Sequence, residues 1–382
     1  MASRLTQVGV PALLAVLLGT CAFADDSGGR WLDVEFPRDS PVLFVSFSLG
    51  PTTAGVRGTS MALDLHTSLL LRNTGKKTIC GLTLRVEAQD LTPSGKGSVT
   101  VPSLNVQAGE VFPVRIDMEL LRPFNIAKTE GAIVQVTLDC ALFSDLSYYG
   151  PDKLDSRRAL TVYELEARRD RRYLAGLLET GKLAQLREEL NFGLQDMNPP
   201  QLGLELLRGP RSNFKGEQAV NVGAVSFPSA PVQPVGGAAR VVGNQVRAPQ
   251  VEVKNRSQKT VRSIEMGWIV RDDQGRDFVA GSVPASMQLG PVQTGSVTEP
   301  GTLRFSQPTG QPMLVGGVMA FVDNVEFADG NLWIPTRRDI TEATNDVVLR
   351  RALSSSPEQQ RLAEIYRRKG INALAVELKR VN

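Results

Sequence analysis

The sequence is poor in the side chains on which most metal and catalytic sites depend. Its 382 residues include one histidine, His66, and three cysteines. Zinc sites and histidine-based triads are therefore disfavoured, because each needs such side chains to converge. We find no P-loop, dinucleotide-binding fingerprint or H-E-x-x-H motif. The sequence thus predicts a protein that uses no cofactor and is not an enzyme.

A large excess of one charge is also missing. Lys and Arg number 43 and Asp and Glu 40, which leaves a formal net charge of +3. Proteins that bind nucleic acid or an anionic membrane surface through electrostatics carry a marked basic excess. We therefore expect neither as a partner.

Long apolar runs are scarce, and the clearest one lies at the start of the chain. The stretch from Val8 to Leu18 follows Arg4 and precedes Ala22-Phe23-Ala24, a small-x-small cleavage pattern. The run is shorter than the ~20 residues of a membrane-spanning helix. We expect a signal peptide over residues 1–24, no transmembrane segment, and a secreted protein that is periplasmic or extracellular after cleavage near Ala24.

Two alternatives to a cleaved signal peptide stay open. The run could remain as an uncleaved anchor, although it is short for that role. Cys21 could instead carry a lipid, although Thr20 stands where bacterial lipoboxes usually have Gly or Ala.

The mature sequence resembles itself at a shift of about 180 residues. Asn73-Thr74-Gly75 lines up with Asn255-Arg256-Ser257, and Val136-Thr137-Leu138-Asp139 lines up with Ala320-Phe321-Val322-Asp323. Further matches follow in the same order, which favours an internal duplication. The alternative is two unrelated β domains with similar strand and turn composition.

Within each half, apolar and polar residues alternate over short segments separated by turns. Cys80, Leu82, Leu84 and Val86 share one face of a predicted strand, and Ile264, Met266, Trp268 and Val270 share another. Turn signals such as Asp272-Asp273-Gln274-Gly275 lie between such strands. The pattern predicts a mainly β fold of two antiparallel sandwiches, each followed by a short helical hairpin.

These strands resemble immunoglobulin-like or fibronectin type III-like domains. The likeness rests on the alternating strands, the Asn73-Thr74-Gly75 turn before a long strand, and the pair Cys80 and Cys140. It would cover about 135 residues in each half. No Trp lies between the two cysteines, which departs from antibody-type domains. The resemblance implies adhesion, scaffolding or ligand recognition, and no chemistry.

Helical spacing follows each predicted sandwich. Apolar residues recur at three and four positions up to Gly181 and again beyond it, and Ser356-Pro357-Glu358-Gln359 has the form of a capping box. We expect each hairpin to pack on its own sandwich, burying Leu177, Leu186 and Leu190 in the first and Leu362, Leu374 and Leu378 in the second. The predicted parts are 1–24 signal peptide, 25–160 first sandwich, 161–198 helical hairpin, 199–340 Pro/Gly-rich entry and second sandwich, and 341–382 C-terminal helical hairpin.

Few residues suggest catalysis. Ser212 and Lys215 form an S-x-x-K spacing, which in serine acyltransferases puts a lysine base near the nucleophile, but they lie in a Pro/Gly-rich stretch. His66 could serve a Ser–His–acid site, although no G-x-S-x-G motif accompanies it. A chance loop match and an ordinary strand-edge histidine are the competing interpretations.

Two charged groups allow further hypotheses. Asp272, Asp273 and Asp277 could bind calcium, or could simply form an acidic hairpin tip. Arg168-Arg169 with Arg171-Arg172, and Arg367-Arg368-Lys369, could contact an anionic partner, or could be helix faces paired with nearby acids.

Cys80 and Cys140 share strand parity with buried apolar neighbours, so both are expected to point between the sheets. Signal cleavage would remove Cys21 and leave an even pair in an oxidising compartment. We expect a Cys80–Cys140 disulfide across the first sandwich, with two separate buried thiols as the alternative.

Two classes of function follow. The first is a secreted or envelope-associated, non-catalytic protein with tandem immunoglobulin-like domains that binds a protein or glycan. The second is an extracytoplasmic hydrolase with Ser212 or His66 in its site.

Overall fold

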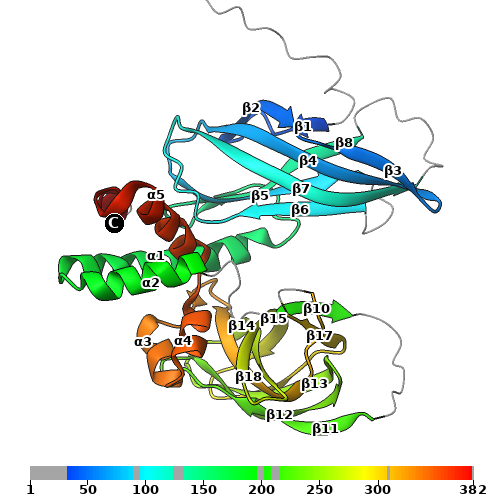
Figure 1. Cartoon of the computed structure of the whole chain (residues 1–382), viewed down its shortest axis with the longest axis vertical. Helices are drawn as coiled ribbons and strands as arrows, with labels where there is room; N and C mark the ends of the chain where they lie inside the picture. The colour runs from blue at the N-terminus through cyan, green and yellow to red at the C-terminus, as the bar shows by residue number, and fades with distance from the viewer. Residues whose placement is uncertain are drawn as a thin grey trace, which may run out of the picture.

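The computed structural model describes residues 32–88, 95–123, 133–195, 202–207, 216–307 and 310–380. Over these residues the chain is mainly β with five helices, and Figure 1 shows the helices beside and between two β regions. The helices are α1 Ser156–Glu179, α2 Leu183–Gln195, α3 Arg337–Ala343, α4 Val347–Ser354 and α5 Pro357–Arg380.

The first β region is a sandwich of two sheets. One sheet has the order β1-β8-β5-β6 with β9 on β8, and the other has β2-β4-β3 with β7 on β4. Its core lies between them and includes Leu69, Leu84 and Ile116, which are fully buried. The strands are β1 Leu32–Glu35, β2 Val42–Leu49, β3 Thr53–Arg57, β4 Ser60–Asn73, β5 Ile79–Glu87, β6 Lys96–Val101, β7 Val111–Pro123, β8 Val134–Phe143 and β9 Tyr148–Tyr149.

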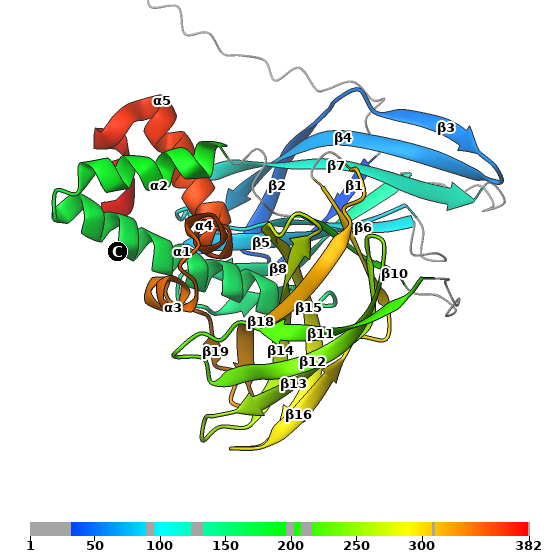
Figure 2. The ribbon, with the colours of Figure 1, turned by 60° about the horizontal axis from the view of Figure 1, so that its bottom comes forward.

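The second β region is one barrel-like sheet of ten strands (Figure 2). The order is β10-β17-β13-β12-β11-β18-β14-β15, with β16 on β13 and β19 on β18. Its two layers form one continuous sheet because β11 pairs with both β12 and β18, and we refer to this barrel-like region as the second sandwich. The strands are β10 Gly203–Leu207, β11 Gln218–Ala224, β12 Val232–Val242, β13 Gln245–Asn255, β14 Val261–Asp272, β15 Asp277–Leu289, β16 Thr294–Thr298, β17 Thr302–Ser306, β18 Val315–Phe327 and β19 Leu332–Trp333.

The two β regions repeat one strand order. The run β1-β8-β5-β6 recurs as β11-β18-β14-β15. The first pair of each run, β1 with β8 and β11 with β18, is parallel. The sequence predicts antiparallel pairs only. This is wrong at one equivalent place in each region, where the first strand of the run points in the same direction as the strand with which it pairs.

The expectation that each helical tail packs on its own sandwich is wrong for the leucines named in it. Leu177, Leu186 and Leu190 of α1 and α2 bury against Leu362, Leu374 and Leu378 of α5. An apolar stripe needs a partner surface, and here the stripes of the two tails cover each other. We call this group of helices the helical module; it joins the middle of the chain to its end.

Helix α5 begins at the predicted residue with one of the two hydrogen bonds of the predicted capping box, while the Gln359 side chain instead donates to the Glu189 carbonyl at 3.1 Å and accepts from Arg337 at 3.0 Å. The Ser356 hydroxyl accepts a hydrogen bond from the Gln359 backbone N–H at 3.2 Å. At Gly370 the backbone has φ 78° and leaves helical geometry, so α5 consists of two helical segments. A left-handed φ of this kind is readily adopted only by glycine.

Helix α1 also contacts both β regions. Leu160, which is buried, packs on Cys140 and Leu142 of β8 in the first sandwich. Arg158, two residues earlier and on the opposite side of the helix, donates to the Asn324 side-chain oxygen of β18 at 2.8 Å. The helix is therefore held by apolar contacts on one side and by polar contacts on the other.

None of the helices in the described ranges is both long enough and apolar enough to cross a membrane. The predicted signal peptide over 1–24 and Cys21 lie outside those ranges.

Candidate binding cleft in the second sandwich

A cleft of about 670 Å³ opens between β15 and β16. These strands follow each other along the chain, yet within the described residues β15 forms a ladder only with β14, and β16 only with β13. The hairpin thus diverges into two sheet edges instead of pairing with itself. Each edge leaves backbone groups that are not used by its own sheet.

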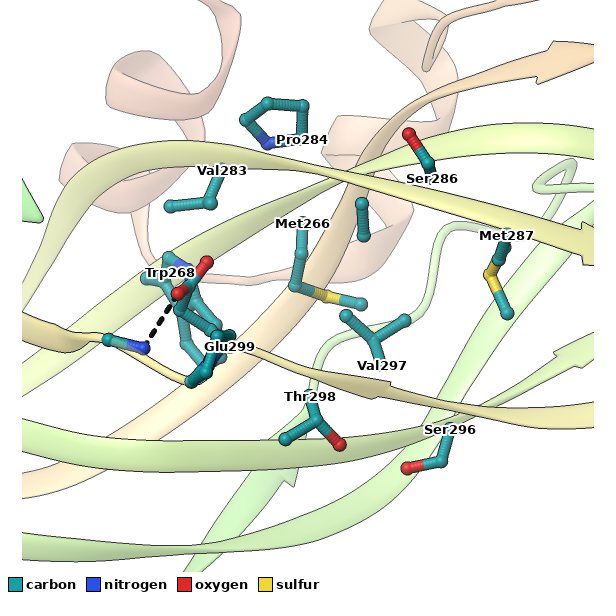
Figure 3. Close-up of a pocket in the computed structure, with 13 residues that line it drawn as sticks. Met266, Trp268, Val283, Pro284, Ser286, Met287, Ser296, Val297, Thr298 and Glu299 are labelled. Atoms are coloured by element: carbon teal, nitrogen blue, oxygen red, sulfur yellow. Dashed lines mark hydrogen bonds between the residues drawn. The ribbon is translucent and has the colours of Figure 1, made fainter. Parts of the chain in front are cut away.

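The floor of the cleft is apolar and comes from β14. Met266 and Trp268 lie between the two edges, with Val297 of β16 beside them (Figure 3). Trp268 is 2% exposed, and its indole Nε1 has no hydrogen-bond partner. The floor therefore contains one unsatisfied polar group, and a buried donor without an acceptor lowers the stability of the fold.

The position of Pro284 shows which backbone groups of β15 point outward. Pro284 stands opposite Glu265 of β14 and has no N–H to donate. In an antiparallel ladder, residues alternate between hydrogen-bonded and non-hydrogen-bonded pairs, and proline fits the latter. The Pro284 carbonyl and the N–H and C=O of Ser282 and Ser286 are therefore directed away from β14, at the free edge.

Glu299 supplies the charge at the rim of the cleft. One of its carboxylate oxygens accepts a hydrogen bond from the Gly301 N–H at 2.8 Å, drawn as the dashed line in Figure 3. No Lys or Arg in the described part of the chain forms a salt bridge with Glu299. The rim therefore presents a negative charge that is free to meet a cation.

The first sandwich closes the corresponding place. There Met118 of β7 lies against Gly97 of β6, and a Cβ atom on Gly97 would fall 2.8 Å from the Met118 Sδ. Met118 therefore fills the space between these two edges. The cleft belongs to the second β region only, as far as the described residues show.

His66 lies on β4 at the surface of the first sandwich. Its Nδ1 is 2.8 Å from Asp117 Oδ1 and its Nε2 is 3.2 Å from Asp64 Oδ1. The hydrogen bond with Asp117 is the main cause that raises the pKa of His66 above its usual value. Because both ring nitrogens face carboxylates, neither is placed to take a proton from a serine. Ser212 and Lys215 lie outside the described residues.

Cys80 and Cys140 are free, buried thiols, and the predicted disulfide is not formed in the structure. The expectation that both point between the sheets is wrong because two β-bulges change the alternation. Ile79 pairs with Phe143 and Gly81 with Leu142, so Cys80 is an extra residue; Asp139 is likewise extra on β8. Both cysteines consequently lie toward α1, and burial raises the pKa of each thiol to about 12.

The three aspartates of the hairpin tip do not converge. Asp272 accepts hydrogen bonds from the Gln274 and Arg276 N–H groups, and Asp277 forms a salt bridge with Arg271 at 2.8 Å. Within the described ranges no cluster of three metal-ligating side chains occurs. The calcium hypothesis therefore finds no ligand set here, and the acidic-tip interpretation fits the contacts.

Most residues of the two basic clusters are paired with acids, as the second interpretation of them predicts; Arg367 and Arg368 both pair with Glu364. Arg171, 3% exposed, lies 2.9 Å from Glu164 and 3.2 Å from Glu358 of α5. Asp170, fully buried, lies 3.0 Å from Arg169 and 2.9 Å from Arg337. These pairs link α1 to the C-terminal part of the chain.

Acidic side chains gather where α1 meets the second sandwich. Burial, followed by the negative charge of Asp323 and its neighbours, raises the pKa of Glu166 to about 8. Burial and the charge of Glu265 raise the pKa of Asp323 to about 6. Arg158 lies 3.5 Å from Glu265 and offsets part of this charge. The junction therefore favours protonated carboxyl groups.

The cleft cannot be predicted from the spacing of its residues in the sequence. Met266 and Trp268 were placed correctly on one strand face, but nothing in their spacing shows that the neighbouring edges stay apart. The available signal was proline in a strand-like segment, Pro284 in β15 and Pro300 just after β16. Proline in a strand marks a sheet edge.

Comparisons with known proteins do not identify the site. No protein-family model and no curated protein matches the chain. A β-glucosidase from Kluyveromyces marxianus aligns at 9% identity over 69% of this chain and 45% of its own, with a TM-score of 0.16. The CBM32-1, CBM32-2 and M60 catalytic domains of Clostridium perfringens ZmpB align at 10% identity over 88% and 42%, with a TM-score of 0.11. The chain spans less than half of either structure. At TM-scores this low, neither structure indicates a fold or an activity for it.

Proposed function

We propose that this protein is a secreted or envelope-associated, non-catalytic binding protein that recognises a protein partner through the cleft of its second sandwich. The observation that supports this most is the cleft itself, which has an apolar floor between two sheet edges and, at its rim, the Glu299 carboxylate, for which the described residues offer no salt-bridge partner. Such a surface offers shape, apolar area and hydrogen-bonding groups, which is what recognition of a protein segment requires. The proposed location rests on the signal-peptide pattern alone.

We further propose that the two sandwiches are immunoglobulin-like copies of one ancestral domain. Their bulges support this, because Cys80 and Asp139 in the first and Arg262 and Asp323 in the second are the extra residues of equivalent ladders. The positions of β-bulges are conserved within protein families.

An equivalent asparagine adds to this support. The Asn73 amide donates to the Lys77 carbonyl at 2.9 Å, and the Asn255 amide donates to the Lys259 carbonyl at 2.8 Å. On this proposal the two copies diverged after duplication, so that within the described residues only the second has the cleft.

Affinity capture tests the function. The mature chain, residues 25–382, is immobilised and exposed to an envelope extract beside two variants. Ser286→Trp puts a large side chain at the cleft mouth, and Ser98→Trp puts the same side chain on the corresponding edge strand, β6, of the first sandwich. We expect a protein retained by the wild type and by Ser98→Trp but lost with Ser286→Trp. Retention of the same proteins by all three forms, or recovery of a glycan instead, contradicts the proposal.

A further inference from the structure

We infer that the cleft binds an extended peptide segment that adds as a strand to the free edge of β15, with apolar side chains on Trp268 and Met266 and a basic side chain near Glu299. This rests on the proposed function and makes it specific. The occupant is a segment of a partner protein in the β conformation, rather than a folded surface or a sugar.

The backbone of β15 offers hydrogen-bonding groups to an incoming strand. Pro284 fixes the phase of the β14–β15 ladder, so the carbonyl of Pro284 and both backbone groups of Ser282 and Ser286 are directed to the free edge. An incoming strand can satisfy these groups with its own backbone, which is the usual mode of strand addition.

The side chains of β15 determine which way the residues of an added strand would point. On β15, Val283, Ala285 and Met287 pack inward against the core, while Pro284 and Ser286 are exposed. A strand beside β15 must follow the same alternation, so every second residue would point to the floor made by Met266 and Trp268. The floor is apolar where Met266 and Trp268 form it, so the residues that point to it should be apolar.

The rim supplies the charge preference. Glu299 lines the cleft and its carboxylate meets no cation in the described residues. Residues of the peptide that point away from the floor lie near this rim, so a lysine or arginine at such a position gains a partner. An acidic peptide would meet like charge and would bind more weakly.

Pro284 also limits the site. It lacks the N–H that a neighbouring strand would otherwise accept, so one position of the edge cannot donate. Proline on an edge strand prevents uncontrolled pairing with other chains. The site would thus accept a strand while resisting pairing between copies of the protein itself.

The test uses the mature chain and a synthetic probe, the fluorescein-labelled nonapeptide Thr-Val-Lys-Val-Thr-Val-Lys-Val-Thr. Its matched control carries N-methyl groups on alternate residues, which removes the donors of one strand edge but keeps every side chain. We expect the probe to bind with a Kd between about 1 and 100 μM and the control to bind at least tenfold more weakly. Hydrogen exchange at the Ser282 and Ser286 amides should slow when the probe is bound.

Two variants sharpen the result. Pro284→Ala restores a donor at the free edge, so probe affinity should rise by about threefold or more, since one added hydrogen bond is worth about 1 kcal/mol. Glu299→Gln should weaken the lysine probe by about threefold and leave a version with Ser in place of Lys unchanged. Thermal unfolding confirms that each variant folds.

Each remaining outcome overturns the inference. Equal binding of the N-methylated control, unchanged exchange in β15, or no binding of the probe at 1 mM would show that no strand is added. If partner capture still depends on Ser286 while the probe fails, only the strand geometry is wrong. If capture does not depend on Ser286 either, the proposed function fails with it.

Discussion

The first sandwich meets helix α1 through apolar side chains, and the second meets it through charged ones. At equivalent ladder positions, Cys140 and Leu142 receive Leu160, whereas Asn324 and Glu326 receive Arg158. Equivalent strands of the two β regions therefore contact helix α1 in two ways, one apolar and one charged. An apolar contact is insensitive to pH and non-directional, while a buried ionic contact depends on every partner being present.

The two sandwiches differ again at the opposite edge. Met118 fills the space beside Gly97 in the first, and the equivalent space in the second is the cleft. At this edge one β region is thus filled, while the other is open. A shared fold does not assign a shared role, because the roles follow from the side chains placed on it.

Removing the charged contact should have the largest effect. Arg158→Met takes away the guanidinium that lies between Glu265 and Glu326, and leaves their carboxylates partly buried with less compensation. We expect the free energy of unfolding to fall by about 3–5 kcal/mol, measured by urea denaturation. Arg338→Met is the control, because Arg338 is 85% exposed and pairs only within its own helix. A loss below about 1 kcal/mol would mean that the charged contact does not hold the second sandwich.

Removing the apolar contact should cost somewhat less. Leu160→Ala leaves a cavity against Cys140 and Leu142, and we expect a loss of about 2–4 kcal/mol. The loss should be the same at pH 5 and pH 8, since the Cys140 thiol beside Leu160, with a pKa raised to about 12, stays protonated at both pH values. Leu154→Ala, at an exposed position just before α1, should change stability by less than about 0.5 kcal/mol. A strong pH dependence of the Leu160→Ala loss would remove the contrast between the two contacts.

The equivalent asparagines test whether the two β regions are alike, whereas the variants at Arg158 and Leu160 test how they differ. Asn73 and Asn255 are both fully buried, and each donates to a carbonyl of its own turn and to a carbonyl of a distant segment, Val106 for Asn73 and Leu289 for Asn255. Asn73→Ala and Asn255→Ala should each cost about 2–3 kcal/mol, because buried carbonyls lose their donors. Separate urea transitions of the two single variants measure this. Costs that differ by more than about twofold would show that the two turns are not equivalent.

The smallest expected effect is a pH dependence confined to the charged junction. The folded pKa values of Asp323 and Glu166, about 6 and about 8, lie above the usual values of these carboxyls. The folded state therefore holds protons that the unfolded state releases, so the contribution of these two carboxyls to stability is greatest below about pH 4 and is lost as the pH rises toward 8. Glu166→Gln should raise the stability at pH 8 by about 1 kcal/mol and change little at pH 5. Equal effects at both pH values, measured by thermal unfolding, would contradict this assignment.

Sequence periodicity predicted the strands and the buried face of most of them. Leu82, Leu84 and Val86 point inward as expected, because a period of two with one apolar face has only one favourable orientation. The prediction for Cys80 and Cys140 was wrong at the bulges, where one extra residue turns the next side chain to the other face. Alternation alone does not reveal an inserted residue.

The partners of the helices and the cleft depend on contacts between distant parts of the chain. The leucines of α1 and α5 predict that each helix must be covered, but many surfaces satisfy that requirement equally well. Similarly, Trp268 and Met266 read as ordinary core residues in their own strand. Only the divergence of β15 from β16, set by the rest of the sheet, makes them the floor of a cleft.

The helical module has a consequence for how the chain folds. Leu174 and Leu177 of α1 find their partners in Leu362 and Leu374, nearly half the chain away. Contacts between such distant residues form slowly, and helices that lack their partner expose apolar surface in the meantime. A chain that emerges from its N-terminus first would complete the first sandwich early and leave α1 and α2 uncovered until α5 appears. The last 24-residue helix would thus act as the closing step of assembly, and a chain that ends before Pro357 would be prone to aggregate through this leucine surface.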